Sequence, residues 1–101
     1  MNLADARRAL DETVHSPVRL TLMSALASVD SADYPTLKEQ MDVSYALLTK
    51  HATILEEAGY LAVSKAFEGK TPRTTYRLTR TGRAAHRAHL AALDRIVQGL
   101  R

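Results

Sequence analysis

The chain has 101 residues, of which 46% are hydrophobic and 25% charged, so it has the composition of one small folded domain. The absence of cysteine excludes a disulfide framework, a thiolate-bound metal and a cysteine nucleophile. No stretch is apolar enough to act as a signal peptide or to span a membrane, and we therefore expect a cytoplasmic protein.

The charge is unevenly distributed along the chain. Residues 1–64 carry five Lys and Arg against nine Asp and Glu, whereas residues 65–101 carry nine against two. The net charge of +3 thus combines a half of −4 with a half of +7. Such a basic half is typical of a surface that faces a polyanion, although charge alone fits a solvated basic face equally well.

The N-terminal third contains two segments with helical spacing of apolar residues. The first predicts a helix over residues 3–13. A second helix is predicted over about 17–28, because Ser16 is a suitable N-cap and Pro17 suits the first helical position. Its buried stripe is expected to contain Val18, Leu22, Ala25, Leu26 and Val29.

A helix-turn-helix is predicted in the middle of the chain. The turn residues of 30–35 indicate a loop, after which a short helix runs to Met41. Residues 42–44 form a tight turn, and Ser44 caps the next helix, about 45–58. Two helices joined by so short a turn are typical of this motif.

The helix over 45–58 is amphipathic when its residues are placed 100° apart. One arc, expected to be buried, contains Leu47, Leu48, His51, Ala52, Ile54, Leu55 and Ala58. The outer side contains Tyr45, Ala46, Thr49, Lys50, Thr53, Glu56 and Glu57. The two glutamates would repel phosphates, so contact with DNA is expected only through the N-terminal half, as in recognition helices of this kind.

A two-stranded ribbon is predicted after this helix. Gly59 is expected to end the helix in the left-handed conformation. A strand over 60–67 follows, with Leu61, Val63 and Phe67 available for the inner face, then a loop over 68–73. The return strand over 74–78 is expected to turn Tyr76 and Leu78 inward and Thr75 and Arg77 outward.

The last helix is predicted to begin after Thr79 or Thr81 and to run to about Val97. Leu90, Leu93, Val97 and Leu100 keep helical spacing, with Ala92 and Ile96 beside them, which is more apolar surface than a small monomer usually leaves on a terminal helix. His86 and His89 lie three residues apart there, but two ligands are too few for a tetrahedral metal site unless the second subunit of a dimer supplies more, which the sequence leaves open. We expect no metal, no cofactor and, since no catalytic motif occurs, no enzyme.

Five segments carry a resemblance to a known family. They are His15 to Leu20, Leu48 to His51, Leu55 to Leu61, Pro72 to Thr79 and Thr81 to Ala85. With them the chain resembles, over roughly residues 15–97, the small winged-helix regulators of bacteria and archaea related to the MarR and ArsR groups. One departure is Tyr45-Ala46-Leu47, where the recognition helix often begins with polar residues, so no target sequence can be carried over.

The resemblance implies a homodimeric transcriptional regulator with recognition helix 45–58 and wing 67–73. The fold class is mainly α with a small β-hairpin: a winged helix-turn-helix over 1–101, with residues 1–14 and 80–101 contributing dimerisation helices. The expected dimer interface contains Leu3, Ala6, Leu10, Leu90, Leu93, Ile96, Val97 and Leu100.

The expected partner is double-stranded DNA, because a helix and a basic hairpin can touch a duplex at two places. The DNA-binding residues are expected to be Ser44, Tyr45, Thr49, Lys50, Thr53, Lys65, Lys70, Arg73, Thr75 and Arg77. The alternative is a winged-helix module that binds another protein without DNA specificity. Operator, sign of regulation and any small-molecule effector stay open.

Overall fold

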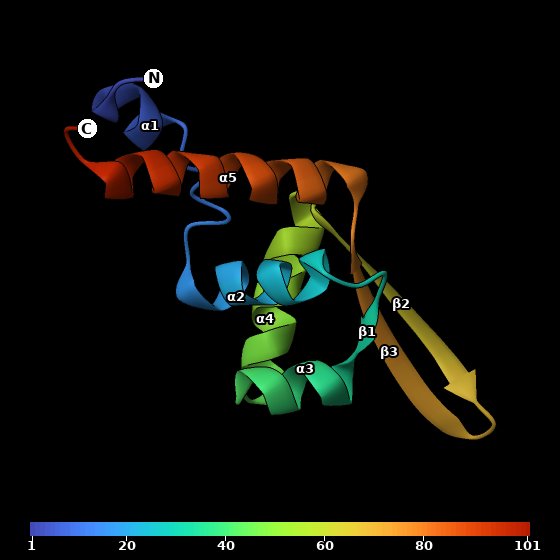
Figure 1. Ribbon diagram of the computed structural model, residues 1–101. Helices are drawn as coiled ribbons and strands as arrows, with labels where there is room; N and C mark the ends of the chain where they lie inside the picture. Colours follow the sequence, from blue (N-terminus) through green and yellow to red (C-terminus); the bar gives the residue numbers. More distant parts are fainter.

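Five helices and a small sheet make up the computed structural model, which describes residues 1–101. The elements are α1 (Leu3–Arg8), α2 (Pro17–Ala27), β1 (Ala32–Asp33), α3 (Tyr34–Met41), α4 (Tyr45–Glu57), β2 (Leu61–Glu68), β3 (Thr71–Leu78) and α5 (Arg80–Gln98). Helix α5 lies across one end of α2 and α4, with α1 against its C-terminal half, and the β2–β3 hairpin projects away from the helices (Figure 1). This arrangement is a winged helix fold, as the sequence predicts.

The helix starts follow from side-chain caps. The hydroxyl of Ser16 accepts from the backbone N–H of Arg19, that of Ser44 from Leu47, and that of Thr79 from Gly82. These three caps confirm the predicted starts of α2, α4 and α5, because each satisfies a backbone donor that the first helical turn leaves unpaired. Asp33 caps α3 in the same way, which the sequence did not indicate.

The hydrophobic core lies where α2, α4 and the sheet meet. It contains Val14, Leu22, Met23, Leu26, Leu37, Leu48, Ala52, Leu55, Leu61, Tyr76 and Leu78. The predicted inward arc of α4 is confirmed at its centre, since Leu48, Ala52 and Leu55 are buried. None of the helices is long and apolar enough to cross a bilayer.

Three side chains that were expected inside are exposed. Val29 is 42% exposed because α2 ends two residues earlier, so the chain has already left the helical stripe. Phe67 is 73% exposed because it lies far out on the hairpin, where no helix covers the sheet face. Ala58 is exposed because it lies just past the end of α4.

Several element boundaries differ from the prediction. Helix α1 ends at Arg8 rather than residue 13, because the chain turns there toward α2 and Asp11 engages α5. Strand β1 was missed: its two residues pair with Tyr76 and Thr75 of β3, and so short a strand has no pattern of its own. The predicted wing loop over 68–73 is wrong, because pairing continues to Glu68 and Thr71 and leaves Gly69 and Lys70 as a two-residue turn.

Two glycines have specific roles where α4, β2 and α5 meet. Gly59 ends α4 with a φ of +82°, which confirms the predicted left-handed position. Gly82 lies so close to the backbone of Tyr60 that a Cβ there would be 2.0 Å from its carbonyl oxygen. The close approach of Gly82 to Tyr60 lets α5 start directly against the beginning of the hairpin.

Replacing Gly82 by alanine is expected to destabilise the fold. The Cβ can be accommodated only if α5 or Tyr60 moves, which should lower the free energy of unfolding by roughly 1–3 kcal/mol. Urea unfolding measures the loss, with Thr81→Ala at an exposed position of the same turn as a control expected within about 0.5 kcal/mol of wild type. Equal midpoints for Gly82→Ala and wild type would contradict the close approach.

Candidate nucleic-acid interface

The outer side of α4 is exposed where the sequence predicts. Tyr45, Thr49, Lys50 and Thr53 all lie on the solvent side of the helix. Tyr45 is 56% exposed and its ring packs edge to face on Tyr34 of α3, with centroids 5.0 Å apart and an interplanar angle of 83°. This contact fixes the direction of Tyr45 at the N-terminal end of α4, where a free aromatic side chain would have several rotamers.

A groove separates α4 from the hairpin. It has a volume of about 330 Å³ and is lined on the helix side by Tyr45, Thr49, Ala52, Thr53 and Glu56, and on the strand side by Val63, Lys65, Thr74 and Tyr76. Four predicted DNA-binding residues therefore share one concave surface: Tyr45, Thr49, Thr53 and Lys65. Thr74 was missed, because only the strand register shows that it faces α4.

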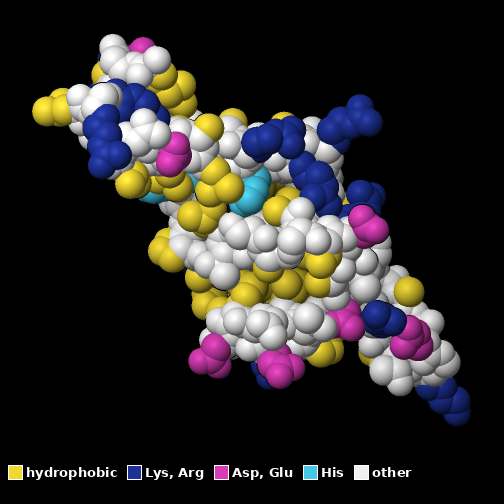
Figure 2. Space-filling view, in the orientation of Figure 1, with side chains coloured by type: hydrophobic (Ala, Val, Ile, Leu, Met, Phe, Trp, Pro, Cys, Tyr) yellow, Lys and Arg dark blue, Asp and Glu magenta, His cyan; other side chains and the backbone are white.

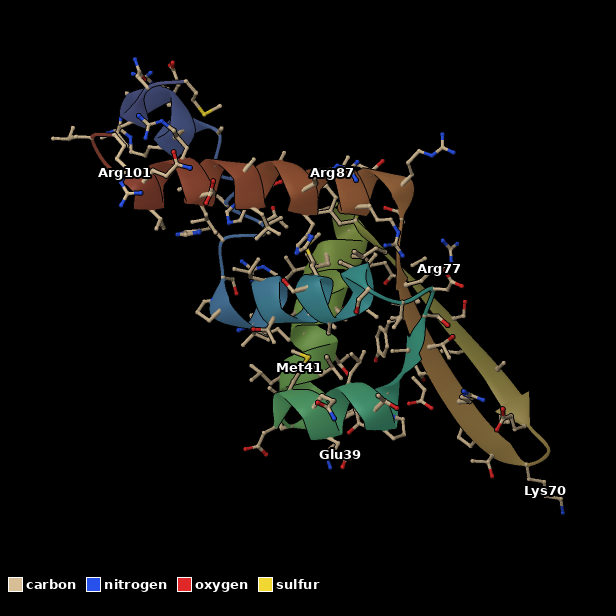
Figure 3. All side chains as sticks on the ribbon, in the orientation of Figure 1. Glu39, Met41, Lys70, Arg77, Arg87 and Arg101 are labelled. Atoms are coloured by element: carbon tan, nitrogen blue, oxygen red, sulfur yellow. The ribbon has the colours of Figure 1, made fainter.

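The strand register divides the other basic residues between two faces of the hairpin. Lys65 lies opposite Thr74, on the face toward α4. Since directly opposed residues share a face and neighbours alternate, Arg73, Thr75 and Arg77 lie on the opposite face. Lys70 is at the tip of the hairpin and points away from the body (Figure 3). The ten predicted residues thus form no single surface.

Arg73 is held by two carboxylates. Its guanidinium forms an ion pair with Glu68 across the hairpin, and a second one, 3.5 Å long, with Asp33 of β1. Asp33 also accepts from the backbone N–H of Thr36 at 3.0 Å. The hydrogen bonds from Thr36, and to a smaller extent the charge of Arg73, lower the pKa of Asp33. Arg73 therefore connects the hairpin to the start of α3, which the sequence did not reveal.

Ser44 and His51 have structural contacts. The hydroxyl of Ser44 accepts from the N–H of Leu47 at 3.1 Å, so it already caps α4 in the absence of DNA. His51 is half-buried, and its Nδ1 lies 3.0 Å from Arg19, which can only donate. Burial, followed by the charges of Arg19 and Lys50, lowers the pKa of His51.

His86 and His89 have different partners. The Nε2 of His86 lies 2.9 Å from the hydroxyl of Ser24, on α2. His89 is fully buried, and its Nδ1 accepts from the backbone N–H of Asp11 at 3.0 Å, so a neutral ring carries its proton on Nε2, 3.3 Å from Nδ1 of His15. The two rings thus do not converge, and no three side chains of the ligand types gather around one point.

The predicted dimer surface is largely exposed. Val97 and Leu100 are 82% and 96% exposed, and Leu90 is also exposed. Leu3, Leu10, Leu93 and Ile96 are partly exposed. Ala6, by contrast, is fully buried in α1, which packs on α5 of the same chain, and so has no surface to offer a partner.

Comparison with known proteins identifies the same winged helix fold. The family model described as "Winged helix DNA-binding domain" matches residues 18–97. No curated protein matches the chain in sequence.

Solved structures resemble the chain in fold. A transcriptional regulator homologue from Pyrococcus horikoshii OT3 superposes with a TM-score of 0.86 at 24% identity, over 97% of this chain and 95% of that one. NadR in complex with 4-hydroxyphenylacetate gives 0.71 at 20% identity, over 97% and 69%. An ArsR family transcriptional regulator gives 0.57 at 17% identity, over 97% and 96%.

The buried histidines make stability depend on pH. Burial lowers the pKa of His86 and His89 as well as that of His51 below the ordinary 6.5. Below about pH 6.5 the unfolded chain therefore binds more protons than the folded protein. The free energy of unfolding should have its full value above about pH 6.5 and fall as the pH drops below it. Urea unfolding at about pH 7.5 and 5.5 measures this fall, which His89→Asn should reduce. Equal stability at both values would contradict the prediction.

Proposed function

Because the chain belongs to the winged helix DNA-binding family, we propose that it is a sequence-specific transcriptional regulator that binds double-stranded DNA as a homodimer. The observation that carries the proposal is the groove in which Tyr45, Thr49, Thr53 and Lys65 meet. Hydroxyl groups and one cation on a concave surface suit base edges and the adjacent phosphates.

The N-terminal half of α4 enters the major groove in this proposal. Thr49 and Thr53 can exchange hydrogen bonds with base edges or present a methyl group to thymine, and Lys50 can contact a phosphate or guanine. Tyr45, oriented by Tyr34, lies beside the sugar-phosphate backbone. Glu56 lies at the other end of the groove, where its charge repels phosphate and limits how far DNA extends along α4.

The hairpin supplies the second contact. Lys70 at its tip reaches backbone phosphates or the minor groove, and Lys65 lies between tip and helix. Arg73 has a different role, since Glu68 and Asp33 hold it in the free protein. A phosphate must compete with these carboxylates, so Arg73 chiefly orients the hairpin relative to α3.

Two subunits are proposed to associate through the terminal helices. The exposed apolar side chains of α5, with those of α1 beside them, form a surface that a second copy would cover. A symmetric dimer favours a pseudo-palindromic operator with half-sites about one helical turn apart. Residues 1–101 are proposed to form one domain that acts in the cytoplasm. Whether a small molecule regulates the protein stays open; the similar NadR was solved in complex with 4-hydroxyphenylacetate.

Selection of bound duplexes from a random pool, with the mass of the protein measured in parallel, tests this function. We expect an enriched palindromic site, the mass of a dimer, and affinity that falls steeply with salt. The alternative, a protein-binding winged helix, predicts no enriched site and weak salt dependence. No enrichment together with a monomer mass would overturn the proposal.

Removing single cations should distinguish their roles. Lys50→Gln and Lys70→Gln should each reduce the slope of log affinity against log salt by about 1 per subunit, because each removes a phosphate contact from each subunit. Fluorescence anisotropy on the selected duplex at several salt concentrations gives the slopes. Arg101→Gln, with the same charge loss at the far end of the chain, should leave the slope unchanged. A similar loss for all three variants would indicate only a general charge effect.

Neutralising Glu68 should strengthen DNA binding. Glu68→Gln leaves Asp33 as the one carboxylate that holds Arg73, so its guanidinium becomes more available to a phosphate and the salt slope should rise by up to about 1 per subunit. Glu57→Gln removes an equal charge from the exposed end of α4 and is the matched control. If both variants bind equally tightly, long-range electrostatics explains the gain and Arg73 is not restrained by Glu68.

A further inference from the structure

Four arginines gather at the junction of β3 and α5, away from the groove. Arg77 lies near the end of β3, and Arg80, Arg83 and Arg87 lie in the first half of α5. Figure 2 shows dark-blue side chains gathered above the base of the hairpin, and Figure 3 labels Arg77 and Arg87 in this region. The patch holds four of the nine cations of the basic half.

Only one of these arginines has a structural task. Arg83 donates to the carbonyl oxygens of Ala27, at 3.0 Å, and Val29, at 2.9 Å, and so satisfies the C-terminal end of α2. Arg77, Arg80 and Arg87 are exposed and form none of the ion pairs or side-chain hydrogen bonds of the chain. Their charges are therefore free for an external anion.

The position of these charges does not favour the stability of α5. Arg80 and Arg83 lie in its first turn, which contains no acidic residue. Cations at a helix N-terminus oppose the macrodipole. Because Arg80, Arg83 and Arg87 are spaced three and four residues apart, they share one face of the helix. Side chains that break a local rule without a compensating contact are expected at functional sites.

We propose that Arg77, Arg80 and Arg87 form a second, sequence-independent contact with the phosphates of DNA that flanks the operator. The inference rests on the proposed function and extends its surface. Guanidinium groups match phosphate oxygens in pairs, and a helix N-terminus adds backbone donors and a positive dipole end.

The lack of any paired acid at the patch and its place at the base of the hairpin favour DNA over an acidic protein. Arg77 belongs to the same hairpin as Lys70 but lies on the face opposite Lys65, so the patch lies beyond the surface that the operator is proposed to contact and needs flanking DNA to reach it. Arg77 lies seven positions from Lys70 along the extended chain, roughly 23 Å, or about seven base-pair steps. DNA must therefore continue past the hairpin, or bend toward α5, to reach the patch.

DNA length is the variable that tests this contact. The selected site is placed in a duplex of about 25 base pairs and in one with about 20 additional base pairs on each side. Wild type should bind the long duplex more tightly and with a steeper salt slope. Arg80→Gln with Arg87→Gln should bind the short duplex within twofold of wild type but lose the gain on the long one, its slope there falling by about 2 per subunit. Arg77 is left in place because it also belongs to the predicted wing set.

Two control variants separate charge from position. Arg80→Lys with Arg87→Lys should keep most of the gain, since lysine also contacts phosphate as a point charge. Arg7→Gln with Arg101→Gln removes two exposed cations at the opposite end of α5 and should keep the whole gain.

The outcomes distinguish the two levels of inference. No gain on the long duplex for wild type, or an undiminished gain for the Arg80 and Arg87 double glutamine variant, overturns the second contact and leaves the proposed function standing. Failure of wild type to bind either duplex overturns the proposed function itself. Binding of wild type and of the double variant to polyglutamate is measured in parallel. If the double variant loses affinity only for polyglutamate, the patch binds acidic protein and the DNA contact is wrong.

Discussion

A partly buried hydrogen-bond network through Asp11 connects α5 to the rest of the molecule. The backbone N–H of Asp11 donates to the fully buried His89 on α5, and its carboxylate accepts from the hydroxyl of Tyr60 at 2.5 Å. That second bond raises the pKa of Tyr60. No buried side-chain polar atom is left without a partner, so the network stabilises one arrangement of α5 against the start of the hairpin.

The same segment also reaches α4, the proposed recognition helix. Arg19 donates from Nε to the carbonyl oxygen of Thr13 and from a terminal nitrogen to His51 on α4. The orientation of α4 relative to α5 is thus determined by contacts that pass through residues 11–19. If two copies associate along α5, these contacts also determine the separation and tilt of the two recognition helices, and hence the half-site spacing that the dimer can read.

The hairpin shows how pairing distributes charge. Residues 65, 70, 73 and 77 look like one basic cluster in the sequence, yet alternation across the strands places Lys65 on the face toward α4 and Arg73 and Arg77 on the opposite face of the hairpin. Ion pairs then restrain Arg73, whereas Arg77 joins the arginines of α5. Side chains two residues apart along a strand lie on the same face, and adjacent side chains lie on opposite faces. The face on which each charge lies therefore depends on the register.

The sequence by itself determined the starts of α2, α4 and α5, the inward arc of α4, the left-handed Gly59 and the helix-turn-helix followed by a basic ribbon. These features arise from local chemistry: a hydroxyl that caps, a 100° periodicity, a residue without a Cβ. Only the tertiary structure decided the pairing of β1, the two faces of the hairpin, the restraint on Arg73 and the burial of His89. Each of these depends on residues far apart in the chain, such as Asp33 with Arg73 or Asp11 with His89, and a contact of that range leaves no periodic signal in the sequence.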